Sequence, residues 1–110
     1  MFSRELKKGS TDMLVLSLLE ARARHGYEIG KQIESASGGR LRFRIGSLYP
    51  ILCRLEDKGL ITGRWVERAG ERRRRYYRLT SLGRKALARE RNLWKQFVTT
   101  VSHIAGVRHA

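Results

Sequence analysis

Side chains that could bind a polyanion gather at two places in this 110-residue chain. Ser47 and Tyr49 place a hydroxyl and a phenol at the start of one segment, and Pro50 follows them. The second place is a run of consecutive arginines, with no acidic residue inside it, formed by Arg72, Arg73, Arg74 and Arg75. Hydroxyl, phenol and guanidinium groups donate hydrogen bonds to phosphate oxygens and base edges. These residue types indicate nucleic-acid contact rather than covalent chemistry.

The positive charge is concentrated in the middle of the chain. The net charge is +14, and residues 40–78 hold twelve basic and four acidic residues of the total. The first 39 residues carry six basic and five acidic groups. The middle third is therefore expected to face a polyanion. A solvated, solubilising surface is the alternative, although such surfaces usually mix the two signs.

Signatures of catalysis, metal binding and membrane insertion are missing from the sequence. His25, His103 and His109 lack the spacing of a metal site, and neither a nucleophile elbow nor a phosphate loop is present. The single Cys53 excludes an internal disulfide and favours a reducing, cytoplasmic setting. The longest apolar stretch is far shorter than the roughly 20 residues that span a bilayer. We expect no enzyme activity, no metal, no cofactor and no membrane partner.

Residues 46–61 carry the pattern of a two-faced helix, which is predicted to run from Ser47 to Lys58. Its apolar side chains recur at helical spacing, at Leu48, Ile51, Leu52 and Leu55. Ser47, Tyr49, Pro50 and Arg54 fall on the opposite side, with Ser47 as the expected N-cap and Gly59 as the end. One face would anchor the helix, and the other would be presented to DNA. Arg54 could reach a phosphate or a guanine edge, or pair with a neighbouring carboxylate, and the spacing leaves both roles open.

Two helices are expected before this one, at residues 10–23 and 26–37. The first is apolar almost all round, so we expect a partner subunit to cover part of it, including Leu14 and Leu18. Residues 40–45 alternate basic and apolar side chains, which predicts a short strand or extended link. Its apolar residues, the last of them Ile45, should point inward, leaving Arg42 and Arg44 outside with Arg40.

A hairpin and a long helix are expected to complete the chain. Strands at residues 61–68 and 73–79, joined by a turn at 69–72, would form a wing with the arginine run at its tip. Thr80 would cap a helix over residues 81–104. No later element could cover the apolar stripe of this helix, which predicts a homodimer built on Trp94, Phe97, Val98 and Val101.

The fold class that follows is mainly α with a small β-hairpin. Residues 1–80 would form a winged helix-turn-helix DNA-binding domain, because the link before the presented helix is longer than in a simple helix-turn-helix. Residues 81–110 would form a dimerisation helix within the same compact unit.

Several motifs resemble those of one bacterial family. They are HGYEI at residues 25–29, GSLYPILCRLE at 46–56, KGLI at 58–61, and YRLT at 77–80 followed by Gly83. In these motifs the chain is similar to the PadR family of transcriptional regulators, in its short form with a single C-terminal helix. The resemblance implies a homodimeric repressor that places one recognition helix in the major groove of each operator half. It also implies that Trp94 could border a pocket for a flat aromatic effector, whereas core or interface packing is the other reading.

Two other functions remain open at this stage. A basic protein could bind any nucleic acid without regard to sequence, although this leaves the presented Ser47 and Tyr49 unexplained. A winged fold could instead hold a protein partner, in which case neutralising the arginine run would not change its activity.

Overall fold

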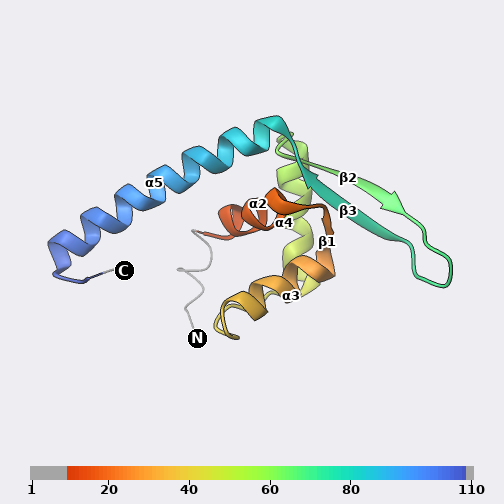
Figure 1. Ribbon diagram of the computed structural model, residues 1–110, viewed down its shortest axis with the longest axis horizontal. Coiled ribbons are helices and arrows are strands. Elements are labelled where there is room, and N and C mark those ends of the chain that lie inside the picture. The colour runs from red at the N-terminus through yellow and green to blue at the C-terminus, as the bar shows by residue number, and fades with distance from the viewer. Residues whose placement is uncertain (1–9, 109–110) are drawn as a thin grey trace.

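The computed structural model describes residues 10–108, in which helices surround the base of a small sheet (Figure 1). The ends of the two expected domains, at residues 1–9 and 109–110, lie outside the described residues, as does His109. The elements are α2 (Thr11–Ala21), β1 (Arg24–His25), α3 (Gly26–Ala36), α4 (Ile45–Asp57), β2 (Ile61–Val66), β3 (Arg74–Leu79) and α5 (Ser81–Ala105). The mainly helical architecture with a small sheet confirms the predicted fold class.

The core lies where α2, α3 and α4 meet the base of the hairpin. The predicted apolar face of α4 is buried there, with Leu48, Leu52 and Leu55 essentially inaccessible to solvent. Helices α2 and α3 and the hairpin contribute Val15, Leu16, Leu19, Ile29, Ile33, Ile61, Tyr77 and Leu79. Burial of this apolar surface fixes the rotation of α4 about its axis, and therefore decides which residues it presents.

The sheet has the strand order β1-β3-β2, with both pairings antiparallel. Strands β2 and β3 form the expected hairpin, in which Gly63 lies opposite Tyr77 and Trp65 opposite Arg75. Tyr77 and Leu79 of β3 point into the core. The third strand, β1, is only two residues long and was not predicted, because its pairing with β3 joins residues about fifty positions apart in the chain.

The prediction for the link before α4 was correct in part and wrong at Ile45. Residues 40–44 form no strand pairing, so the link is the second of the two predicted alternatives, and its apolar Leu41 and Phe43 pack against the core. Ile45 does not point inward: it is the first residue of α4 and is 52% exposed. Arg44, not Ser47, is the N-cap residue, and Pro50 therefore lies inside the helix beyond its first turn. Pro50 cannot donate to the Gly46 carbonyl, so one helical hydrogen bond is lost on this exposed face.

Tight turns set the geometry on either side of β2. Gly59 has a φ of 75° after the last turn of α4, and Leu60 N bonds Leu55 O at 3.0 Å, which completes a Schellman motif. Thr80 caps α5, as predicted, by accepting a hydrogen bond from Gly83 N at 2.9 Å. A Cβ on Gly83 would lie 2.0 Å from Leu60 O, so only glycine lets α5 start this close to the hairpin.

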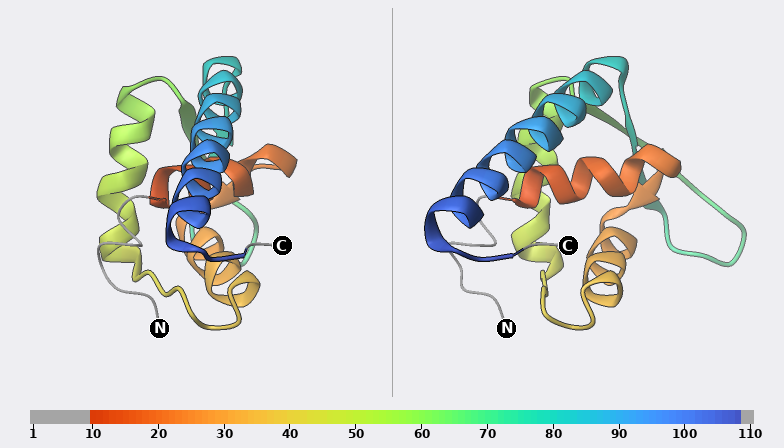
Figure 2. Two further views of the ribbon diagram at one scale, coloured as in Figure 1. Left: turned by 90° about the vertical axis from the view of Figure 1, so that its left-hand side faces the viewer. Right: turned by 60° about the vertical axis from the view of Figure 1, so that its left-hand side comes forward.

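Helix α5 runs away from the hairpin, so that the wing and the end of α5 lie at opposite extremes of the molecule (Figure 1). Helix α2 packs against α5, and Arg91 ties the two helices together by pairing with Glu20 at 2.9 Å (Figure 2). Within residues 10–108, no helix is long and apolar enough to cross a membrane.

Candidate nucleic-acid interface

The N-terminal half of α4 is the presented part of the helix. Ser47, Tyr49 and Pro50 are all exposed beside the buried Leu48, as the two-faced pattern predicted. A hydrogen bond with Cys53 raises the pKa of the Tyr49 phenol above its usual value. Because Tyr49 is 56% exposed, its phenol can exchange this bond for one to an acceptor on DNA. The positive end of the helix dipole lies at the same end and favours an anion there.

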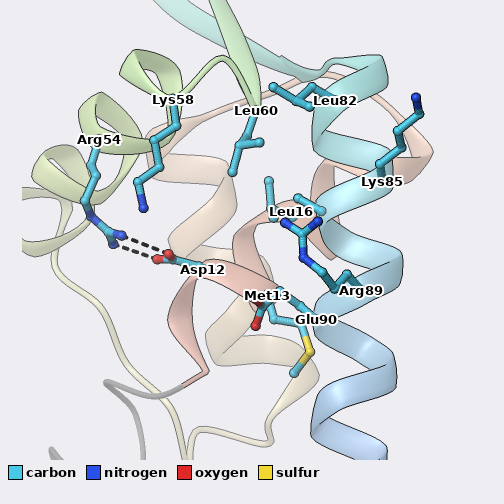
Figure 3. Close-up of a pocket in the computed structure, with 11 residues that line it drawn as sticks. Asp12, Met13, Leu16, Arg54, Lys58, Leu60, Leu82, Lys85, Arg89 and Glu90 are labelled. Carbon is cyan, nitrogen blue, oxygen red and sulfur yellow. Dashed lines mark hydrogen bonds and ion pairs between the residues drawn. The ribbon is translucent and has the colours of Figure 1, made fainter.

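Arg54 is further along α4 and is already engaged with a carboxylate. Its guanidinium makes a bidentate pair with Asp12 of α2, with Nη2 to Oδ1 at 2.7 Å and Nη1 to Oδ2 at 2.9 Å (Figure 3). This is the carboxylate partner that the sequence left open as one of two roles. The pair borders a cavity of about 750 Å³ between α2, α5 and the C-terminal end of α4. Arg54 therefore links α4 to α2 at the end of the helix remote from Tyr49.

The four arginines of the wing are not equivalent. Arg73 stacks over the Trp65 ring at 4.5 Å and lies 3.8 Å from Glu67, both contacts on the exposed side of the hairpin. The guanidinium of Arg74 lies 5.9 Å from the centre of the Tyr27 ring. Arg72 is exposed at the tip, whereas Arg75 turns inward and is half-buried. Three of the run therefore face solvent, and the fourth does not.

A groove of about 440 Å³ separates the start of α4 from the wing. Its lining brings together Tyr49 of the helix and all four arginines of the run, Arg72, Arg73, Arg74 and Arg75, with Arg75 at its inner side. It also includes two aromatic residues that the sequence did not single out, Tyr27 and Trp65. The exposed ring of Tyr27, at the start of α3, could have been found from its place in the HGYEI motif. Trp65 could have been found from its place opposite the arginine run in the predicted hairpin. A basic groove with aromatic walls suits a nucleic-acid backbone.

Arg42 and Arg44 are exposed beside this groove, at the N-terminal end of α4. Arg42 lies 3.7 Å from Glu34, a long and weak ion pair on the surface. Arg44 precedes the first turn of α4, so its charge adds to the positive end of the helix dipole. Both predicted positions therefore lie at the N-terminal end of α4, the end that carries Tyr49.

His25 connects α3 to the wing. Its Nδ1 accepts a hydrogen bond from Glu28 N at 3.2 Å and so caps α3, and Arg74 Nη1 lies 3.4 Å from the same ring. Burial and the nearby Arg74 charge lower the pKa of His25 below its usual value. The ring is therefore neutral at physiological pH, which is the form that can accept from the backbone.

The apolar stripe of α5 has no cover among the described residues. Phe97 is 60% exposed, and Trp94, Val101 and Ile104 are also exposed. The other predicted interface residues, Leu14, Leu18 and Val98, are partly buried. A cavity of about 440 Å³ lies between α2 and α5, lined by Leu14, Trp94 and Val98 and edged by the cations Arg91 and Lys95. The stripe and this cavity form one continuous apolar region on the side of the molecule away from the wing.

Within residues 10–108, no group of three or more potential metal ligands lies close together. The side chains gathered at the groove are hydroxyls, aromatic rings and guanidinium groups instead. This arrangement can bind an extended polyanion.

Comparisons with known proteins agree with this geometry. The family model described as "Transcriptional regulator PadR-like family" matches residues 15–89. Among solved structures, a transcriptional regulator from Clostridium thermocellum is 29% identical, with a TM-score of 0.83 over 90% of this chain and 96% of that one. A PadR family transcriptional regulator from Eggerthella lenta is 30% identical, with a TM-score of 0.82 over 94% of this chain and 88% of that one. A PadR family regulator from Clostridium difficile is 31% identical, with a TM-score of 0.76 over 87% and 98%.

Proposed function

Because the chain belongs to the PadR-like family of transcriptional regulators, we propose that it is a homodimeric repressor that binds a palindromic operator in double-stranded DNA. The family is one of DNA-binding regulators rather than enzymes. The observation that carries the finer proposal is the presented face of α4, where Ser47 and Tyr49 are exposed while Leu48 beside them is buried. We propose a cytoplasmic location, where a bacterial regulator meets its operator.

The first turns of α4 are proposed to enter the major groove. A helix fits this groove, and its N-terminal residues reach the base edges in helix-turn-helix proteins. Ser47 and Tyr49 would read bases, and Pro50 would pack beside them. Arg42 and Arg44 would hold phosphates next to the groove. Arg54 is left out of this set, because its guanidinium is satisfied by Asp12.

The wing is proposed to contact the flanking backbone or minor groove. Arg72, Arg73 and Arg74 face solvent at its tip, where a narrow minor groove would attract them. These contacts supply affinity to any sequence, whereas those of α4 supply discrimination. A binder without sequence preference would need only the wing.

The dimer is proposed to form through the apolar stripe of α5 and the facing side of α2. An exposed row that includes Trp94, Phe97 and Val101 is costly in water and is the kind of surface that a second copy covers. Two-fold symmetry would place the two α4 helices on the same face of the duplex. The half-sites would then be one helical turn, about 10 bp, or a multiple of that apart.

A planar aromatic effector is proposed for the cavity beside Trp94. The apolar walls of this cavity suit a ring, and Arg91 and Lys95 at its edge suit an acidic substituent. Tryptophan quenching by 2-naphthoate would test this in the Trp65→Phe variant, in which Trp94 is the only remaining tryptophan. Saturable quenching supports the pocket, and a purely collisional, linear response contradicts it.

The operator proposal is tested by binding to the DNA upstream of the protein's own gene. Fluorescence anisotropy at physiological salt should show binding to this DNA well above that to a random duplex of equal length. Tyr49→Ala should reduce specific binding far more than non-specific binding, and Tyr49→Phe separates the loss of the hydroxyl from the loss of the ring. Equal affinity for both duplexes would favour sequence-independent binding, and unchanged function after neutralising Arg72, Arg73 and Arg74 would favour a protein partner.

A further inference from the structure

The carboxylate of Glu56 joins the presented helix to both strands of the wing. Its Oε2 accepts a hydrogen bond from Arg75 Nη2 of β3 at 2.7 Å and another from Gly63 N of β2 at 2.9 Å. The side chains of Glu56 and Arg75 are 28% and 27% exposed, so water screens the pair only in part. One oxygen atom therefore links α4, β2 and β3.

The sequence of β2 is adapted to this link. The Arg75 side chain crosses the hairpin over Gly63, and a Cβ at position 63 would lie 2.6 Å from Arg75 Nε. Any side chain there would push the guanidinium out of its path to Glu56. Strand β2 is an outer strand of the sheet, so Glu56 also satisfies one of its backbone donors. Gly63 thus serves the link both by its missing side chain and by its amide.

Aromatic rings hold Arg75 on both sides. Its guanidinium lies 5.7 Å from the centre of the Trp65 ring and 5.8 Å from that of Tyr77. Trp65 also carries Arg73 at 4.5 Å on the exposed side. Trp65 therefore contacts both Arg75 and Arg73, so a change in the position of Arg75 would also move a solvent-facing arginine of the wing.

We infer that Glu56 is a positioning residue for DNA binding, and that Arg75 is a strut inside the protein rather than a DNA contact. Glu56 fixes the angle between α4 and the wing, so that Tyr49 and the wing tip reach the duplex at the same time. We call the contacts of Glu56 with Arg75 and Gly63 the clamp. Tyr49, Cys53 and Glu56 share one side of α4 at helical spacing, so the clamp lies two turns behind Tyr49, the proposed base-reading residue. The inference deepens the proposed function and rests on it for its DNA readout.

Neutralising Glu56 tests whether this residue positions the wing or only adds negative charge, because the two roles predict opposite changes in DNA affinity. Removing an acidic group near DNA should strengthen binding by electrostatics alone. Glu56→Gln should instead weaken binding to the upstream DNA by about tenfold, which corresponds to about 1.4 kcal/mol. Arg75→Lys keeps the charge but lacks the planar guanidinium that lies beside the Trp65 and Tyr77 rings, and should weaken binding in the same direction. Glu67→Gln removes an exposed acid of the wing and should leave binding equal or stronger.

A second readout does not depend on DNA. Amide hydrogen exchange of Gly63 should be faster in Glu56→Ala and Arg75→Gln than in the wild type, while the core amides of α4 stay protected. Asp12→Asn is the matched control, because it breaks an equally short pair on the opposite side of α4 and leaves the wing link intact (Figure 3). It should lower stability without changing Gly63 exchange.

The outcomes separate the two proposals. Faster Gly63 exchange in the clamp variants, with no preference of the wild type for upstream DNA, would leave the clamp in place as a structural link and remove its role in operator binding. Unchanged Gly63 exchange, or stronger DNA binding by Glu56→Gln, would overturn the clamp.

Discussion

Replacing Arg72 by alanine should change how DNA binding depends on salt. Arg72 is exposed at the wing tip, and no described carboxylate lies within ion-pair distance of it. Its charge is therefore available to a phosphate, unlike that of Arg75. Each phosphate neutralised by the protein contributes about 0.9 to the slope of log K against log salt, so two wings in a dimer make the loss about 1.8.

This slope difference gives a measurable change in affinity. Between 50 and 200 mM salt, a slope change of about 1.8 alters the ratio of wild-type to variant affinity by about tenfold. Anisotropy titrations at four salt concentrations, on both upstream and random duplexes, would measure it. The slope should change equally on the two DNAs, because phosphate contacts carry no sequence information.

Lys85→Ala is the matched control for this prediction. It removes the same charge from an exposed residue near the start of α5 beside the Arg54–Asp12 cavity (Figure 3), at the base of the hairpin and not at the wing tip. Its slope should stay close to that of the wild type. Equal slope changes for the two variants would show that the overall charge of the protein, not the wing, sets its affinity for DNA. No slope change for Arg72→Ala would show that the wing tip does not contact DNA phosphates.

Three further predictions concern assembly and stability. Phe97→Glu should dissociate the dimer in sedimentation experiments and abolish operator binding, whereas Thr99→Glu on the opposite side of α5 should do neither; a dimeric Phe97→Glu protein would exclude the α5 interface. Because the pKa of folded His25 is lowered, stability should fall as pH decreases through about 6.5, the usual histidine value, and a wild-type loss between pH 7 and 5.5 no larger than that of His25→Asn would argue against this origin. Leu52→Ala should reduce the free energy of unfolding in urea by about 2–5 kcal/mol, because this side chain is fully buried in the core; a loss below 1 kcal/mol would mean that the core is loosely packed.

The parts predicted correctly from the sequence depend on local periodicity. The spacing of Leu48, Leu52 and Leu55 identifies the buried face of α4, and therefore also the exposure of Tyr49 on the other face. The hairpin and the Thr80 cap follow from short-range signals in the same way. Once one face of a helix is buried, the residues exposed on its other face are determined.

The parts that could not be predicted depend on tertiary contacts. Strand β1 exists only because β3, about fifty residues further along the chain, lies beside it. The partners of Arg54 and Arg75 are also set by packing, since Asp12 is 42 residues from Arg54 and Glu56 is 19 residues from Arg75. Composition places both arginines in a basic region, but only the fold shows that carboxylates already occupy them.

Dimethyl sulfate footprinting on the upstream DNA tests the presentation of α4 most directly, because this reagent methylates guanine N7 in the major groove and adenine N3 in the minor groove. The wild type should protect guanine N7 at two symmetric sites one helical turn, about 10 bp, or a multiple of that apart. Tyr49→Ala should lose this protection first, while it retains non-specific binding. Binding with no protected guanine N7, or protection of the minor groove alone, would contradict the placement of the Ser47 and Tyr49 face in the major groove.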